Sequence, residues 1–295
     1  KSDSPHELDI RLPFSLVSNN PHTNELEVMP AYWWLYNMYA IARNTSKYRK
    51  RDKRRRKVQH IEFETLAPDT VEEILAARTL IEQWVGRAHL LKRGSPDPAT
   101  TPDRLGAAGR ELLNRSPEEA GRLEVFGEGM EHGRRRVRIL KPCQAYRAYG
   151  DMAVFYAVKT IAAYLRQSPT TPIGDLIREK PAFRQWVNLG GQLAPEAEVD
   201  RLIRDIGDGT LDSWPDIHRR YDELWETYPT EKVRHACDTL LRASGDGSGE
   251  LTPAVWQRAL TEAARIQLYI RDQVYATRKK DYDNEFRSAT FRNEA

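Results

Sequence analysis

The chain has 295 residues, a length that fits one large domain or two ordinary ones. Hydrophobic residues make up 40% of the sequence and charged residues 30%, which predicts a globular protein with a substantial core. The net charge is only +3, so positive charge is local, and a protein that is basic over its whole surface is excluded.

The cysteines and the apolar runs indicate the compartment. Cys143 and Cys237 are far apart in the sequence and have no metal-ligand neighbours, so we expect two free thiols in a reducing cytosol. No apolar run approaches the ~20 residues that span a membrane, and no signal peptide is visible. We therefore expect a cytoplasmic protein with no membrane partner. Because the sequence begins at Lys1 without an initiator Met, we also expect a piece of a longer protein.

Residues 1–29 read as an extended N-terminal arm. Residues 12–17 and 26–29 are short apolar runs of strand character, and the Asn-Asn-Pro sequence at 19–21 is typical of a turn. We expect this arm to be the end of a missing N-terminal domain.

The most aromatic stretch of the sequence follows, from Pro30 to Asn44. Pro30 suits the first position of a helix, because its missing N–H would have no partner there. The predicted helix is apolar nearly all round, which is typical of a buried core element. The alternative is that its aromatic side chains line a pocket, since rings with a polar tip suit such walls. The candidates are Tyr32, Trp33, Tyr36 and Tyr39.

The most basic stretch comes next, with nine Lys or Arg residues among the eleven from Lys47 to Lys57. Like charges at this density repel one another, which favours a solvated or disordered loop. The alternative is a phosphate-binding site, either for nucleic acid or for a nucleotide-linked small molecule.

Helical periodicity covers most of the remaining chain. The first of these helices has a capping box formed by Thr70 and Glu73. We predict helices over residues 70–89, 103–114, 143–167, 173–179, 196–206, 214–227, 229–243 and 252–275.

One β-hairpin is predicted between these helices. Its strands are residues 123–126 and 136–140, and its tip carries a second basic patch at residues 134–136. Gly190 and Gly191 lie between apolar residues, which indicates a turn with positive φ or a close backbone approach. The predicted fold is thus mainly α, a multi-helix bundle with one small hairpin. The helical domain spans residues 30–295, with minor breaks near 168–172 or 244–251.

Motifs for catalysis are absent from the sequence. No His pair has zinc-ligand spacing, and there is no phosphate-binding Gly-x4-Gly-Lys-Ser/Thr motif and no Gly-x-Ser-x-Gly. Cys143 with a distant His is a possible nucleophile pair, but a buried thiol is the simpler interpretation. We therefore name no catalytic residue, expect no cofactor or metal, and leave open whether the protein is an enzyme.

Several segments together resemble a known family. They are residues 12–15, 28–34, 36–39, 42–44, 51–54, 66–70, 186–191 and 195–199. On these segments the chain is similar to the C-terminal part of a bacterial family of unknown function. Longer members carry an N-terminal left-handed parallel β-helix of hexapeptide repeats, and some are loosely labelled as related to nucleotide-sugar pyrophosphorylases or acyltransferases. This chain lacks the repeats, which argues against acyltransferase chemistry in this piece alone.

Three functional hypotheses follow. In the first, the domain packs on a β-helix or a second subunit and helps to bind an anionic small molecule, a nucleotide-sugar or sugar-phosphate. In the second, the basic run and residues 134–136 bind RNA or another nucleic acid. In the third, the domain is purely structural and mediates homo-oligomer assembly. The candidate ligand-binding residues are Trp33, Tyr36, Arg43, Asn44, Arg51, Lys53 and Arg54.

Overall fold

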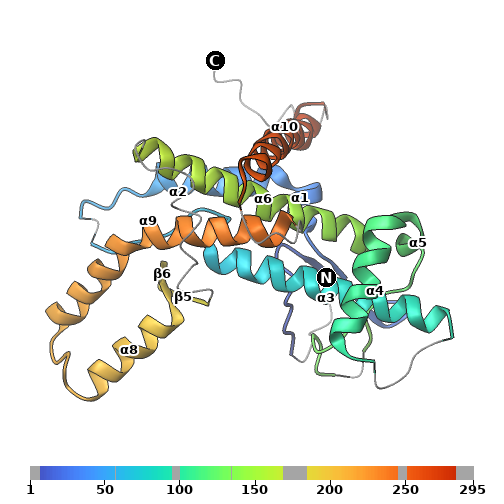
Figure 1. The fold of residues 1–295 in the computed structure, drawn as a ribbon, viewed down its shortest axis with the longest axis horizontal. Coiled ribbons are helices and arrows are strands. Elements are labelled where there is room, and N and C mark those ends of the chain that lie inside the picture. Colours follow the sequence, from blue (N-terminus) through green and yellow to red (C-terminus); the bar gives the residue numbers. More distant parts are fainter. Residues whose placement is uncertain are drawn as a thin grey trace. The chain divides into compact units, whose positions relative to one another are not determined.

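The computed structural model describes residues 7–56, 58–94, 100–133, 135–168, 185–244 and 251–283 (Figure 1). The chain divides into two compact units. Unit 1 contains residues 1–41, 73–151 and 270–295, and unit 2 contains residues 42–72 and 152–269. The predicted mainly α fold is confirmed, while the predicted domain boundary at residue 29 stays a prediction.

Unit 1 contains a four-stranded sheet in the order β1-β2-β4-β3. Antiparallel pairs join β1 (Leu16–Asn20) to β2 (Glu25–Met29) and β3 (Phe126–Gly127) to β4 (Val137–Ile139). Parallel pairing of β2 with β4 joins these two antiparallel pairs into one sheet. The predicted hairpin is therefore present, with shorter strands, and the N-terminal arm extends it into a larger sheet.

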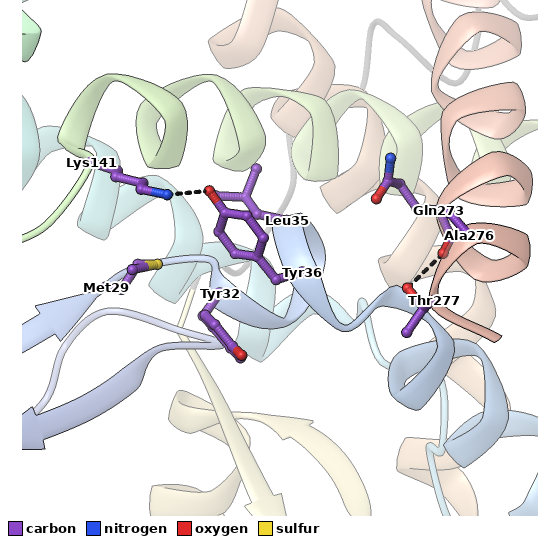
Figure 2. Close-up of a pocket in the computed structure, with 8 residues that line it drawn as sticks. All are labelled: Met29, Tyr32, Leu35, Tyr36, Lys141, Gln273, Ala276 and Thr277. Carbon is purple, nitrogen blue, oxygen red and sulfur yellow. Dashed lines mark hydrogen bonds between the residues drawn. The ribbon is translucent and has the colours of Figure 1, made fainter. Parts of the chain in front are cut away.

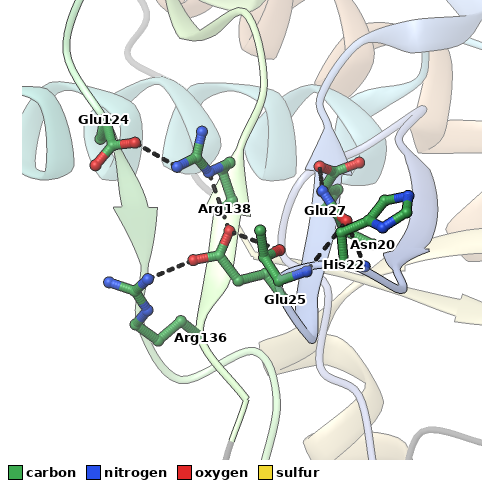
Figure 3. A network of polar contacts seen from close by, with 8 residues as sticks. Asn20, His22, Glu25, Glu27, Glu124, Arg136 and Arg138 are labelled. Carbon is green, nitrogen blue, oxygen red and sulfur yellow. Dashed lines mark hydrogen bonds and ion pairs between the residues drawn. The ribbon is translucent and has the colours of Figure 1, made fainter.

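Charged side chains neutralise one another across this sheet (Figure 3). Glu25 is only 4% exposed, and its carboxylate accepts hydrogen bonds from Arg136 at 2.5 Å and from Arg138 at 3.2 Å. Arg135 donates to Glu131 at 3.0 Å. Residues 135 and 136 of the predicted second basic patch are thus engaged in ion pairs, and Arg134 lies outside the described residues.

The aromatic stretch forms two helices where one was predicted. Ala31 adopts a left-handed φ of 54°, so the first helix, α1 (Tyr32–Tyr36), starts after Pro30. It ends at Asn37, and α2 (Met38–Arg51) follows. Within α1 only Trp34 is buried, so α1 is not the central core helix that its apolar composition predicted. The helix α2 also takes in the first part of the basic run, which is therefore not a loop.

The other helices of unit 1 include α4 (Pro102–Arg115), α5 (Pro117–Gly121) and parts of α3 (Pro68–Lys92), α6 (Pro142–Gln167) and α10 (Pro253–Tyr282). Helices α3 and α4 cross where two glycines meet. A Cβ added to Gly86 would lie 1.9 Å from the carbonyl oxygen of Leu105, and one added to Gly109 would lie 1.8 Å from that of Glu82. The two backbones are therefore in direct contact at the crossing.

Unit 2 contains the hairpin of β5 (Trp186–Leu189) and β6 (Gln192–Pro195), together with α8 (Glu196–Gly207) and α9 (Trp214–Ser244). The hairpin turns at Gly190 and Gly191, whose φ values of 64° and 112° confirm the predicted positive φ.

The helix α9 replaces the two helices predicted over 214–227 and 229–243. Pro229 lies inside it, although a proline removes a backbone hydrogen bond and costs ~3 kcal/mol in a helix interior. Leu224, Tyr228 and Val233 are buried on either side of this position. Packing therefore holds the helix continuous where local propensity predicted a break.

Some predictions fall outside the described residues: the short helix at 173–179 and most of the breaks near 168–172 and 244–251. In the described parts of the chain, no helix combines the length and apolar character of a membrane-spanning segment.

Replacing either crossing glycine by alanine will destabilise unit 1. Because the nearest atoms are backbone, Gly86→Ala or Gly109→Ala is expected to cost about 3 kcal/mol or more, the upper end of overpacking penalties. Urea unfolding followed by circular dichroism measures this. Gly106→Ala in the same helix α4 is the matched control, since its added Cβ would lie 3.8 Å from the Gln83 side chain. It is expected to stabilise by about 0.5–1 kcal/mol, and equal effects of the three substitutions would contradict the close crossing.

Candidate functional site

The predicted ligand-binding residues fall in different parts of the fold. Trp33 and Tyr36 belong to α1 in unit 1, with exposed fractions of 37% and 41%. The polar candidates belong to unit 2 and are exposed: Arg43, Asn44 and Arg51 on α2, and Lys53 and Arg54 after it. Only Tyr36 of the seven lines the pocket described next.

The pocket lies within unit 1 and has a volume of about 430 Å³. Its walls come from the end of β2 and the helix α1, from the residue before α6, and from the C-terminal half of α10 (Figure 2). The lining residues are Met29, Tyr32, Leu35, Tyr36, Lys141, Gln273, Ala276 and Thr277. The volume is in the lower part of the range of about 300–1,000 Å³ found for small-molecule sites.

Lys141 and Tyr36 form the polar centre of this pocket (Figure 2). The Lys141 ammonium donates a hydrogen bond of 2.7 Å to the Tyr36 hydroxyl and lies 4.7 Å from the ring centroid. The Tyr36 hydroxyl in turn donates to Gln144 Oε1 at 3.2 Å. The ring of Tyr32 stands 5.5 Å from that of Tyr36, tilted by 38°. One cation therefore faces a wall of two aromatic rings.

Unusual backbone conformations hold these groups in place. Lys141, Ala31 and Phe14 have φ values of 52°, 54° and 59°, in the left-handed region that costs a non-glycine residue roughly 1–2 kcal/mol. The Phe14 carbonyl accepts from the Trp33 N–H at 3.1 Å, which anchors α1. Strain of this kind clusters at binding sites, where surrounding structure enforces it. It is a reason, independent of the pocket's shape, to regard this region as functional.

The lining combines one charged side chain with neutral polar and aromatic ones. Lys141 carries the only formal charge among the eight lining residues. Gln273 and Thr277 add hydrogen-bonding side chains from α10, and the Thr277 hydroxyl donates to the Gln273 carbonyl at 2.6 Å. Sequence reasoning missed Lys141, Gln273 and Thr277 because each is distant in sequence from the aromatic stretch. The Lys-Pro pair at 141–142 signalled only a helix start.

The basic run divides into two parts with different surroundings. Arg43, Lys47 and Arg51 repeat every four residues on α2, and repulsion from Arg43 and then Arg51 lowers the pKa of Lys47. Within the described residues, no carboxylate forms an ion pair with any of these three side chains. Arg54 instead donates to Asp52 at 2.8 Å, and this hydrogen bond raises the pKa of the Arg54 guanidinium.

Comparison with known proteins gives two similarities. Residues 177–290 match the family model described as "Domain of unknown function (DUF6819)". The chain is also 39% identical over 292 residues to an "Uncharacterized protein" of Treponema pallidum (strain Nichols). That alignment covers 98% of this chain and 38% of the relative, so the chain spans well under half of the relative's length. No solved structure matches.

The match to DUF6819 covers only one wall of the pocket. Gln273, Ala276 and Thr277 lie inside the matched range, whereas Tyr36 and Lys141 lie before it. The similarity to the Treponema protein, by contrast, extends over nearly the whole chain. The site therefore depends on more of the chain than the matched domain.

Neither cysteine is placed as a nucleophile. Both are free thiols, with Cys143 in unit 1 and Cys237 in unit 2. Desolvation raises the pKa of Cys143, and it raises the pKa of Cys237 to about 12. A thiol with a raised pKa is a poor nucleophile at neutral pH. Within the described residues, no group of three or more His, Cys, Asp or Glu side chains is arranged to hold a metal ion.

Unit 2 has a polar core of its own. His235 is fully buried and joins Tyr156, at 2.9 Å from its Nδ1, to Glu72, at 2.9 Å from its Nε2. Nearby, Glu62 accepts hydrogen bonds from Tyr228 at 2.7 Å and from Lys232. These groups satisfy one another and stabilise the interior.

The ionisation of Glu62 makes the stability of unit 2 sensitive to acid. Burial opposes ionisation, but Lys232 and the hydrogen bonds of Glu64 and Tyr228 outweigh it and lower the Glu62 pKa below its ordinary 4.5. A lowered folded-state pKa stabilises the fold above about pH 4.5, and this stabilisation is lost as the pH falls through the lowered value.

In urea titrations from pH 7 to pH 3, Glu62→Gln should be less stable than the wild type at pH 7 and should lose less stability on acidification. An unchanged pH profile would contradict this role.

Proposed function

We propose that the pocket of unit 1 binds a phosphorylated or nucleotide-linked sugar. The observation that carries the proposal is the Lys141 ammonium, held 2.7 Å from the Tyr36 hydroxyl in a pocket where it is the only formal charge. An ammonium in this setting recognises an anion as a point charge. The aromatic faces of Tyr32 and Tyr36 suit the apolar side of a sugar ring, and Gln273 and Thr277 supply partners for its hydroxyls.

We further propose that this chain is the helical C-terminal part of a longer protein whose N-terminal region is a β-helix of hexapeptide repeats. Two observations support this. The sequence segments that resemble such proteins are spread over the chain, and the Treponema relative continues well beyond the aligned region, which is 38% of its length. In this proposal the helical part contributes a sugar-binding site, and the β-helix is its partner within the same protein.

The ligand test uses three probes: glucose 1-phosphate, UDP-glucose and uncharged methyl glucoside. Either phosphorylated sugar is expected to raise the melting temperature in a thermal-shift assay, because a ligand that binds only the folded state stabilises it. Methyl glucoside should give a smaller rise.

In isothermal titration, Lys141→Met is expected to weaken the binding of the phosphorylated sugar by about 10- to 100-fold, because one hydrogen bond to a charged group contributes about that much affinity.

Lys92→Met is the matched control, since Lys92 is an exposed lysine of unit 1 outside the pocket. It should bind like the wild type. Lys141→Gly adds a second readout: it removes the ammonium and relieves the positive φ of 52°, so it should bind the ligand as weakly as Lys141→Met yet unfold at a higher temperature than that variant. If no probe binds at millimolar concentration, or if Lys141→Met binds unchanged, the proposed site is wrong.

Assembly is a second candidate function, favoured by exposed apolar side chains of unit 2. Ile203 and Ile206 on α8 are 62% and 43% exposed, and Trp214 at the start of α9 is 73% exposed. On α8, Val199 and Leu202 are buried at neighbouring helical positions, so the apolar side of this helix is only partly covered. We propose that this surface binds the same surface of a second copy of the chain, as in most homodimers.

Sedimentation velocity tests this assembly. The wild type is expected to dimerise in the micromolar range, and the double variant Ile203→Glu with Trp214→Glu should remain monomeric. Leu268→Glu is the control, because Leu268 of unit 2 is 52% exposed on a different helix, α10. A wild type that stays monomeric at high concentration would exclude self-association through this surface.

A further inference from the structure

The helix α2 carries a regular row of cations in unit 2. Arg43, Lys47 and Arg51 occupy positions i, i+4 and i+8, so their side chains emerge from one side of the helix. With a rise of about 1.5 Å per residue, successive members stand about 6 Å apart along the axis. We name these three residues the cationic stripe. Lys50, which is exposed, lies on the same side.

The charges of the cationic stripe are not compensated within the described chain. Repulsion from Arg43 and Arg51 lowers the pKa of Lys47, as this spacing of like charges predicts. Other basic side chains of unit 2 differ in this respect: Arg220 contacts Glu198 at 2.6 Å, and Lys159 contacts Glu64 at 2.6 Å. A polyanion laid along the stripe would relieve the repulsion and release its own counterions.

An aromatic pair flanks the stripe. Tyr48 is the residue after Lys47 on α2. Its ring stacks on the ring of Phe63, with centroids 5.0 Å apart and ring planes at 21° to each other. The Tyr48 hydroxyl also receives a hydrogen bond of 3.4 Å from Arg54. Surfaces for single-stranded nucleic acid combine these same two elements, a track of cations and aromatic side chains beside it.

We propose that the cationic stripe binds the phosphodiester backbone of a single-stranded nucleic acid, with about one phosphate for each of Arg43, Lys47 and Arg51. The regular spacing favours a partner whose negative charges also repeat regularly, and an extended sugar–phosphate chain has such a repeat. The two guanidinium groups suit phosphate oxygens, which they contact in a bidentate manner. This inference is independent of the pocket in unit 1.

The proposal separates the stripe from the rest of the basic run. Arg54 is already held by Asp52, and Lys53, Arg55 and Arg56 follow the end of α2 at Arg51 without a helix to space them. If density of charge alone mattered, both parts of the run would bind equally. If ordered spacing matters, the helical part dominates.

Fluorescence anisotropy with a labelled single-stranded RNA, titrated at several salt concentrations, tests this inference. Three neutralised phosphates predict a slope of log K against log salt of about −2, so affinity should fall roughly 20-fold between about 50 and 200 mM salt. The triple variant Arg43→Gln, Lys47→Gln, Arg51→Gln should lose this slope and bind at least tenfold more weakly at low salt.

The matched control is Lys53→Gln, Arg55→Gln, Arg56→Gln, which removes the same charge from the same run and should keep most of the slope. The double variant Arg43→Lys, Arg51→Lys keeps the charge and should also keep the slope, and circular dichroism checks that each variant is folded. An equal loss in both triple variants, no binding of RNA at low salt, or tighter binding of poly-glutamate than of RNA would each overturn the proposal. Equal binding of single-stranded DNA would support it, since the recognised group is the phosphodiester.

Discussion

The buried strand β2 is the element on which the arrangement of unit 1 depends. It pairs with β1 on one side and with β4 on the other, and Leu26 and Val28 are 3% and 0% exposed. The strand leads directly into α1, which carries Tyr36, and the Val28 carbonyl accepts a hydrogen bond of 2.8 Å from the N–H of Leu140, next to Lys141. One strand therefore sets the positions of both partners of the pocket's polar centre, although they are 105 residues apart.

The aromatic stretch and the basic run, adjacent in sequence, carry two separate proposals. In the pocket a single ammonium lies beside two rings, so the affinity of the proposed ligand would depend on fit and on one well-placed charge. On α2 we propose that several cations act together, so affinity there would depend on counterion release and fall with salt. The two mechanisms call for different ligands, a compact ring with an anionic group in one case and an extended polyanion in the other.

The sequence predicted the helical fold because helical periodicity and caps are local signals. The glycine turn at 190–191 is of this kind. The predicted capping box at Thr70 is wrong, because α3 already starts at Pro68 and the Thr70 hydroxyl, inside the helix, donates to Asp69 at 3.4 Å. The sequence did not predict the break at Asn37 or the continuity of α9 through Pro229, because packing against distant residues decides both. The candidate site was found only in part for the same reason. Tyr36 was recognisable in an aromatic stretch, whereas Lys141 acquires its role only through the parallel pairing of β2 with β4.

The placement of the two free thiols has a consequence for following the dynamics of this protein. Cys143 is partly exposed in unit 1, whereas Cys237 is 3% exposed in unit 2 and has a pKa of about 12. Alkylation requires an accessible thiolate, so Cys237 reacts only when the interior of unit 2 opens. The alkylation rate of Cys237 therefore reports the opening of unit 2, whereas the partly exposed Cys143 reacts without such an opening and serves as a reference thiol in the same chain.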